Sequence, residues 1–271
     1  LRGPRMNAAT EARQSELDRV TDSIAPSAEL ASELFAVADL LGGQPALRNA
    51  LADPTSQDSR RRGMAEAVFG QRVSADALTV VGGAAALRWG TGGRMVGALE
   101  RQGLRALFAT AHAAGRLGTV EDELFRFSRT VVSDHALRQA LDDRNAPVAV
   151  RQQLVDDLLD GRVEPLTVQL ARRAAASASR SFELTIEEYL RLAAATRQRQ
   201  VAVVTVARPL DDEQKARLQA VLSEKLNRQL TLQVLVDPTV LGGARVRVGD
   251  EVIEGTVAGR LTAARQQLTT S

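Results

Sequence analysis

The chain has 271 residues, of which 44% are apolar, 25% charged and only 3% aromatic, and it contains no cysteine. This balance is typical of folded domains, two or three at this length, and the lack of cysteine excludes disulfides, thiol catalysis and thiolate metal sites. The formal net charge is only +2, and acidic and basic residues alternate, which indicates solvated helix faces and not a nucleic-acid-binding surface.

The N-terminal two thirds of the chain contain an internal repeat at an offset of 90 residues. Residues 33–70 align without a gap to residues 123–160, and 10 of these 38 positions are identical. The identical positions include Glu33-Leu34-Phe35 with Glu123-Leu124-Phe125, and Arg61 with Arg151. Unrelated helices of this composition would share roughly three or four positions, so we interpret the repeat as a duplication.

The first copy, residues 7–101, is predicted to be a helical bundle. Two of its helices show apolar residues at helical spacing. These residues are Leu17, Val20 and Ile24 on the first, and Leu30, Leu34, Val37 and Leu41 on the second. The run Arg60-Arg61-Arg62 is interpreted as a solvated face. After a flexible joint at residues 90–93, residues 94–114 are predicted to form one helix that both copies share, weakened at Gly97 and Gly103.

The second copy shows a clearer helical pattern. Leu104, Leu107, Phe108 and Ala111 mark a helix that ends at Gly115, and Thr119 with Asp122 resembles the cap of the next. The acidic run 121–123 is expected in the first turn of that helix, where it complements the macrodipole. Its inner face is predicted to contain Val120, Leu124, Phe127 and Val131.

Three further helices are predicted in the second copy after a short one at residues 136–141. The first begins at Pro147 and presents Val150, Leu154 and Leu158, and the second covers residues 166–177. The last covers residues 181–197. Its inward residues are predicted to be Phe182, Ile186, Tyr189, Leu190 and Ala193.

After residue 200 the apolar period changes from that of a helix to that of a strand. Residues 201–206 form a β-rich run, and Asp211 with Gln214 caps a helix. Residues 230–236 then alternate between apolar and more polar side chains, which indicates a strand.

Residues 244–248 are the next predicted strand, joined to residues 251–253 by a hairpin turn at Gly249-Asp250, and Thr256 opens a final helix. The order is therefore β-α-β-β-β-α. The fold class is mainly α with a small α+β C-terminal domain. The predicted domains are two tandem helical bundles, residues 1–101 and 102–198, and the α+β domain, residues 199–271.

Residues 237–261 resemble the signature of the ATP synthase delta subunit family, called the oligomycin-sensitivity-conferring protein in mitochondria. The window combines an acidic turn, a Leu-Gly-Gly step, an alternating strand, a Gly-Asp hairpin and a Gly-to-Arg-Leu helix entry. The signature residues are Asp237, Pro238, Leu241, Gly242, Gly243, Val246, Gly249, Asp250, Ile253, Gly255, Arg260 and Leu261. Gly242-Gly243 permits a bulge or a positive φ where the strand turns sharply.

The resemblance extends upstream to about residue 103. The additional N-terminal bundle departs from the usual family pattern and resembles the longer delta proteins of high-GC actinobacteria. The resemblance therefore implies a long form of the family.

The usual chemical motifs are incomplete. Gly90, Gly92 and Met95 give only part of a dinucleotide fingerprint, and no Lys and Ser/Thr follow Gly97 as a phosphate loop requires. His112 and His135 lie on different predicted helices, and Ser133-Asp134-His135 is contiguous, so its side chains point different ways. Residues 78–87, the longest weakly polar stretch, are too few to span a bilayer. We expect no active site, cofactor or metal, and a membrane link only through partners.

The resemblance implies a non-catalytic stator subunit of a rotary ATP synthase, at the cytoplasmic face of the plasma membrane. In this family the helical bundle binds the N-terminal helix of an alpha subunit, and the C-terminal domain binds the end of the b-subunit stalk. By analogy, the candidate alpha-tail groove contains Leu104, Leu107, Phe108, Phe182, Ile186 and Tyr189. The duplication suggests a second such groove in residues 7–101, unless that copy only braces the stalk.

Two other functions stay open from the residues alone. Arginine richness suggests a helical nucleic-acid-binding regulator, although a recognition helix and an aromatic stacking platform are missing. An acyl- or phosphoryl-transfer enzyme would need a nucleophile, a base and a phosphate loop that the sequence does not show.

Overall fold

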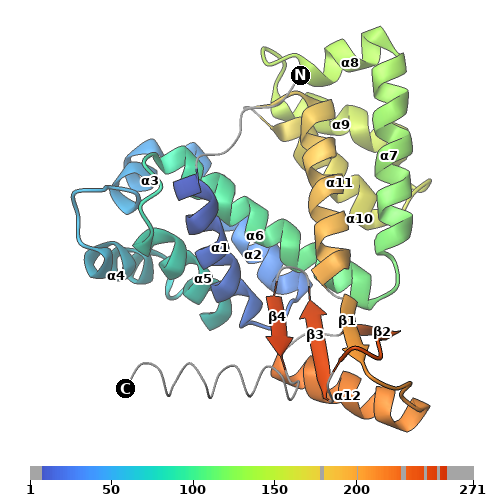
Figure 1. Ribbon diagram of the computed structural model, residues 1–271. Helices are drawn as coiled ribbons and strands as arrows, with labels where there is room; N and C mark the ends of the chain where they lie inside the picture. The colour runs from blue at the N-terminus through green and yellow to red at the C-terminus, as the bar shows by residue number, and fades with distance from the viewer. Residues whose placement is uncertain are drawn as a thin grey trace. The chain divides into compact units, whose positions relative to one another are not determined.

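The computed structural model describes residues 8–177, 180–199, 201–226, 230–240, 243–248 and 251–254. In these residues the chain is mainly helical, with a small mixed sheet after the helices, which confirms the predicted fold class (Figure 1). Two compact units are distinguished. One contains the described residues up to Leu107 and those from Arg197 onward, and the other is Phe108–Thr196. The division into three domains remains a prediction.

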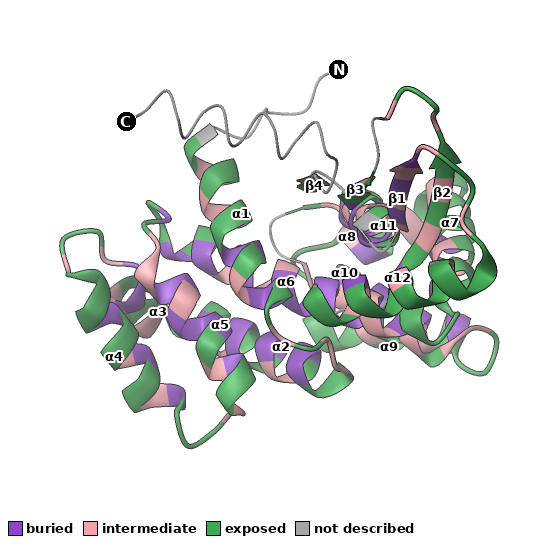
Figure 2. Cartoon of the chain, turned by 60° about the horizontal axis from the view of Figure 1, so that its bottom comes forward, coloured by how far each residue is buried: buried purple, intermediate pink, exposed green. Residues whose placement is uncertain are grey.

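The first copy of the repeat consists of α1 to α6. Their bounds are α1 Ala8–Asp22, α2 Ala28–Gly43, α3 Pro45–Leu51, α4 Asp58–Phe69, α5 Ala75–Ala86 and α6 Gly92–Ala113. Ser27 and Ser74 cap α2 and α5 by accepting a hydrogen bond from a backbone N–H three residues later. The four apolar residues predicted on the second helix are all buried, and Figure 2 shows such buried faces along the helices.

The predicted shared helix is confirmed as α6, which is continuous across both glycines. Gly103 is required by packing, because a Cβ at this position would lie 2.7 Å from the Phe35 ring of α2. Gly97 has open space around it. The absence of a side chain at Gly103 therefore lets α6 approach α2 closely.

An ionic cluster joins α1 to α6 in the first unit. The Asp18 carboxylate is buried, and it accepts a hydrogen bond from Gln102 Nε2 at 2.9 Å and pairs with Arg105 Nη1 at 3.0 Å. Arg101 donates to the same oxygen, and Arg105 also pairs with Asp22. Burial raises the pKa of Asp18, but the two arginines and the hydrogen bonds outweigh it, so the pKa lies below its ordinary value.

The second copy continues with α7 Leu117–Ser133, α8 His135–Asp142, α9 Val148–Leu159, α10 Pro165–Ala176 and α11 Phe182–Arg199. Gly115 has φ +70° at the end of α6, as expected of a helix stop. The predicted cap at Thr119 is wrong, because α7 already begins at Leu117. The four predicted inner residues of α7 are nevertheless buried.

The predicted inner face of α9 is wrong by one residue. Val150 is exposed, and the buried positions are Arg151, Val155 and Leu159. Pro147 is the residue before the first turn of the helix, and an arginine and not a valine faces the core. The apolar pattern predicted the wrong face of α9 because it contains no signal for a buried arginine.

The helices of the two copies coincide at the offset of 90 residues. The bounds of α4 and α9 differ by this number, as do those of α5 and α10. Glu33 accepts hydrogen bonds from Ser74 N and Oγ at 2.8 and 2.6 Å, and Glu123 accepts from Glu164 N and Thr167 Oγ1 at 3.0 and 2.5 Å. Glu123 thus holds the start of α10 and does not lie in a first turn, which corrects that prediction. The structure supports a duplication.

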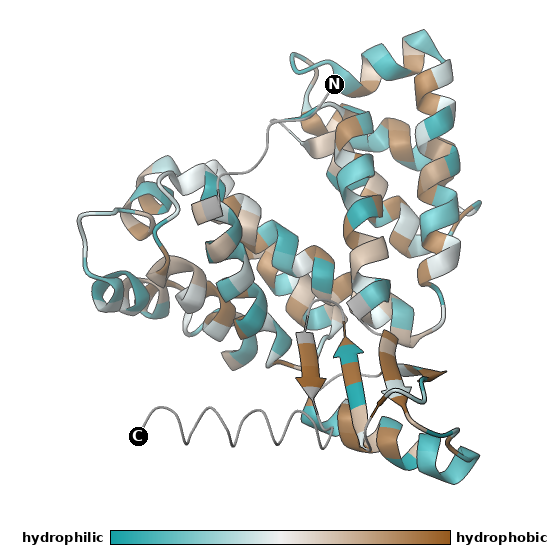
Figure 3. Ribbon diagram, in the orientation of Figure 1, coloured by the Kyte–Doolittle hydropathy of each residue, from teal (hydrophilic) through white to brown (hydrophobic). Residues whose placement is uncertain are grey.

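The C-terminal domain contains β1 Val201–Val206, α12 Asp212–Lys225, β2 Thr231–Val236, β3 Ala244–Val248 and β4 Glu251–Glu254. The sheet order is β2-β1-β3-β4, with β1 parallel to β2 and antiparallel to β3. Asp211 and Gln214 form the predicted capping box of α12. Leu222 of α12 packs on the buried face of the sheet, with Val204 of β1 and Val246 of β3. Hydropathy varies within the strands and around the helices (Figure 3).

Part of the family signature can be placed in this domain. Gly243 has φ +81°, a positive φ of the kind anticipated for the glycine pair. Asp237 Oδ1 accepts from Thr239 Oγ1 and N at 2.7 and 2.9 Å, and these bonds hold the pKa of Asp237 below its ordinary value. The predicted hairpin turn and final helix lie outside the described residues, as do Leu241, Gly242, Gly249, Asp250, Gly255, Arg260 and Leu261.

Candidate interaction site

The six side chains predicted to form a partner groove are buried in this chain, each with 7% or less of its surface exposed. Leu104 and Leu107 belong to the first compact unit, whereas Phe108 and the three residues of α11 belong to the second. Phe182 contacts Phe127 edge to face, with ring centroids 5.6 Å apart. These side chains build cores, so a partner would contact their exposed neighbours. Their part in a groove remains a prediction.

The exposed apolar side chains of the second unit are on other positions. Leu184 on α11 is 52% exposed and Phe125 on α7 is 57% exposed. The exposure of Phe125 could not be predicted from the sequence, because the equivalent residue of the first copy, Phe35, is a phenylalanine that is buried. Single exposed apolar residues are ordinary, but Leu184 lies two residues from buried Phe182 and Ile186 and marks a surface of α11 that a partner helix can cover.

The C-terminal sheet has an outer face opposite its core. In register across the strands lie Val203 of β1, Arg247 of β3 and Val252 of β4. Val252 is 53% exposed, Arg247 is exposed and Val203 is half-buried. Leu235 of β2, also exposed, pairs with Thr205 of β1. We call these residues the outer sheet face. Its mixture of apolar and basic groups suits a partner segment that is amphipathic and acidic.

No group of three or more histidine, aspartate or glutamate side chains among the described residues is placed to hold a metal ion. Asp134 accepts hydrogen bonds from Ala136 N and Leu137 N and so caps α8, which explains its place beside His135. Gly92 and Gly93 open helix α6. Among the described helices, none is both long and apolar enough to cross a membrane.

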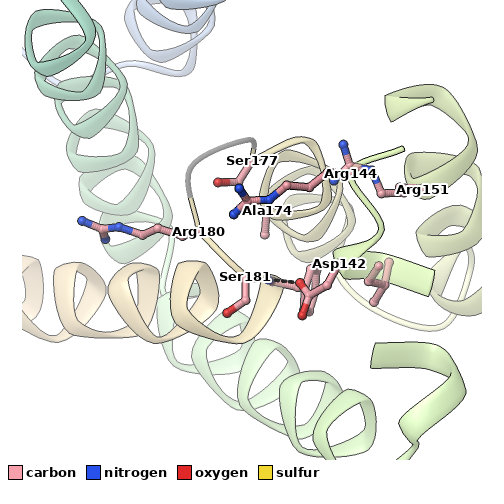
Figure 4. Close-up of a pocket in the computed structure, with 9 residues that line it drawn as sticks. Asp142, Arg144, Arg151, Ala174, Ser177, Arg180 and Ser181 are labelled. Atoms are coloured by element: carbon pink, nitrogen blue, oxygen red, sulfur yellow. Dashed lines mark hydrogen bonds between the residues drawn. The ribbon is translucent and has the colours of Figure 1, made fainter. Parts of the chain in front are cut away.

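A small cavity of about 110 Å³ lies within the second unit, where α8 meets α11 and α9 meets α10 (Figure 4). Leu141 and Phe182 supply apolar walls. The polar side chains that line it are those of Asp142, Arg144, Arg151, Ser177, Arg180 and Ser181. Asp142 Oδ1 accepts from Phe182 N at 2.7 Å, which fixes the start of α11 against the end of α8.

Arg61 is the polar residue that sequence reasoning placed wrongly. It is 1% exposed, and not part of a solvated basic face with Arg60 and Arg62. Its Nε donates to Ala85 O at 2.6 Å, Nη2 donates to Ala86 O and pairs with Asp58, and Nη1 donates to two further carbonyls. The signal that could have identified it was its identity with Arg151 inside the repeat.

The chain is similar in sequence to known proteins over most of its length. A family model described as ATP synthase delta (OSCP) subunit matches residues 104–268. The chain is 44% identical to the ATP synthase subunit delta of Parafrankia sp. (strain EAN1pec), over 95% of this chain and 96% of that protein. It is 41% identical to the ATP synthase subunit delta of Cutibacterium acnes, over 97% of this chain and 100% of that protein. A chain in a Toxoplasma gondii mitochondrial ATP synthase hexamer is 20% identical, with a TM-score of 0.31, over 61% of this chain and 94% of that chain.

Proposed function

We propose a function on the premise that the chain belongs to the ATP synthase delta (OSCP) subunit family, in its long actinobacterial-type form. The chain is a non-catalytic stator subunit. It connects the alpha subunits of the catalytic head to the b-subunit stalk, so that proton flow is coupled to ATP synthesis. It acts at the cytoplasmic face of the plasma membrane, which it reaches through the complex.

The observation that carries this proposal is the extent of the family match. It covers the second helical bundle and the C-terminal domain together, and these are the two parts that a connector needs. Rotation exerts torque on the head, and a stator resists it by tight contacts that dissociate slowly. An interaction surface, and not an active site, is therefore the part on which this function depends.

The alpha subunit is assigned to the helical second unit. An amphipathic N-terminal helix buries its apolar side on the surface of a bundle, and each Å² of apolar area contributes about 25 cal/mol before ordering costs. Leu184 is the exposed apolar residue of α11 available for such a contact. Beneath it, Phe182 and Ile186 hold the helix in place and contribute rigidity.

The b-subunit stalk is assigned to the C-terminal domain. The outer sheet face offers Leu235 and Val252 for apolar contact and Arg247 for an acidic side chain of the partner. Its residues come from all four strands, so a partner bound there contacts a rigid surface and not a loop.

Two surface variants test the assignment of the two partners. Calorimetric titrations use the full chain with an alpha N-terminal peptide and with a C-terminal b segment from the same organism. Leu184→Glu is expected to weaken alpha binding at least tenfold and leave b unchanged, and Val252→Asp is expected to do the reverse. Each variant is the other's control for folding. If both variants bind both partners as the unchanged chain does, or if the effects are exchanged, the assignment is wrong.

A further inference from the structure

We propose that the cavity between α8, α9, α10 and α11 binds a phosphate group, with Arg151 and Arg144 as its principal ligands. Arg151 is 5% exposed, lines the cavity, and has a buried Nε without a hydrogen-bond partner. A buried donor that is left unsatisfied costs free energy. An oxyanion in the cavity would satisfy it.

The first copy of the repeat shows how such an arginine is satisfied when no ligand is needed. Arg61, at the position equivalent to Arg151, donates to the carbonyls of Ala85 and Ala86 and pairs with Asp58 at 2.9 Å. In the second copy no described residue forms an ion pair with Arg151. The same helix position therefore holds a neutralised arginine in one copy and an arginine without a counter-ion in the other.

The cause lies in substitutions between the copies. Asp58, the counter-ion of Arg61, corresponds to Val148, so the carboxylate is lost. Pro54 corresponds to Arg144 and Gly90 to Arg180, so two cations are gained beside the cavity. Asp142, which also lines the cavity, corresponds to Ala52, so one acid is gained as well. The loss of one acid, the gain of another and the addition of two bases change the local charge by two units toward positive. Divergence of the duplicate has thus produced an anion-binding environment.

The geometry favours a phosphate group over a carboxylate. Three arginines and Asp142 line the cavity, but Arg180 is paired with Glu188. Arg144, Arg151 and Asp142 therefore leave a net charge of +1, which favours an anion. Guanidinium groups bind phosphate oxygens in pairs, and the Ser177 hydroxyl adds a further donor. In Figure 4, Arg144 extends toward Ser177, whereas Arg180 points away; Arg180 lies 3.6 Å from Glu188.

The test is an NMR titration of the full chain with sodium phosphate, with sodium chloride used to keep ionic strength constant. The backbone amides of Arg151 and Phe182 report on the cavity. Val148→Asp restores the acid three residues before the arginine, as in the first copy, and is expected to weaken phosphate binding at least tenfold. Arg144→Gln should have the same effect. Both positions are exposed, so neither change requires the core to repack.

Arg126→Gln is the matched control, because it removes one positive charge from an exposed position in the same unit. It is expected to bind phosphate as the unchanged chain does. ATP is titrated in parallel: equal or weaker binding assigns the site to the free anion, and tighter binding assigns it to the phosphates of a nucleotide. The proposal is overturned if phosphate causes no saturable shift, if Val148→Asp binds as well as the unchanged chain, or if acetate binds as tightly as phosphate.

Discussion

Single buried charges hold the first bundle together. Asp18 lies at the position where the second copy has Phe108. The first copy therefore has a buried ionic cluster where the second copy has a buried apolar side chain. Removal of one member of a buried pair leaves the other charge unsatisfied, which costs more than the pair contributes. The sole tryptophan, Trp89, is buried in the same unit and gives a direct probe of this bundle.

We expect Asp18→Asn to lower the free energy of unfolding by about 2 kcal/mol, because the buried Arg105 then keeps only the more exposed Asp22 as a charge partner. Trp89 fluorescence during urea unfolding at pH 7 measures this. Glu29→Gln, an exposed change on the neighbouring helix, is the control and should be nearly neutral. A loss below about 0.5 kcal/mol in the Asp18 variant would show that the cluster is not a stabilising contact.

The pH dependence of the free energy of unfolding follows from the lowered pKa of Asp18. The pKa of Asp18 is lower in the folded chain than in the unfolded one, so its contribution is present above the unfolded value of about 3.9. That contribution is lost as pH falls through the folded pKa. Between pH 5 and 2 the free energy of unfolding should therefore fall more steeply in the unchanged chain than in Asp18→Asn. Parallel curves for the two proteins would contradict the lowered pKa.

Gly243 is the residue of the C-terminal domain with the sharpest conformational requirement. Its φ of +81° is unfavourable for a β-branched side chain, so Gly243→Val should destabilise this domain by about 1–3 kcal/mol. Amide hydrogen exchange in β1 and β3 should accelerate, while exchange in α7 stays unchanged. Gly118→Ala, at a helical glycine with open space around it, is the control. Unaltered exchange in both strands would show that the positive φ is not required.

Among the elements, periodicity predicted α1, α2, α6 to α12 and the four strands, because each buries one face, but it did not predict α3, α4 and α5 individually. It failed where polar residues decide the register. Arg151 and not Val150 faces the core of α9, and Arg61 lies inside although its neighbours are solvated. Glu123 was assigned to a helix dipole but holds the start of α10. A buried charge has no periodic signature, since its place depends on partners distant in sequence.

The approach of α6 to α2 gives a prediction for packing between elements. Gly103→Ala places a Cβ 2.7 Å from Phe35 Cε1, too close without displacement of the ring, and should cost about 1–3 kcal/mol. Gly97→Ala, on the same helix with open space, should instead stabilise by up to about 1 kcal/mol. Urea unfolding followed by Trp89 fluorescence compares the two. Equal stability of the two variants would show that α6 can move away from α2 freely.

At the scale of the whole molecule, the role of the first bundle is the least expected feature. The relatives match this chain over nearly their full length, so the duplicated bundle is part of the long form. We infer a second groove for an alpha tail in this bundle, since a catalytic head of this type carries three alpha subunits. The alternative is that this bundle is a brace for the stalk.

The stoichiometry of binding distinguishes these roles. With two grooves, an alpha N-terminal peptide should bind to the full chain at two sites and to a chain that begins at Gly103 at one site. Tethering would also raise the effective concentration at the second groove. Loss of the first bundle should therefore lower the affinity for the head by more than the loss of one of two independent sites would. Isothermal titration calorimetry measures both the stoichiometry and the affinity. Equal stoichiometry in the two proteins would end the idea of a second groove.

In the proposed function, one chain binds head and stalk at the same time through different parts. Size-exclusion chromatography with light scattering measures this directly, with the purified chain, an alpha N-terminal peptide fused to a carrier protein, and a C-terminal b segment. We expect a ternary complex whose mass contains both partners, and Val252→Asp should remove only the b segment from it. If the two partners displace each other, or if b binds only to residues before Arg197, the chain does not connect them as proposed.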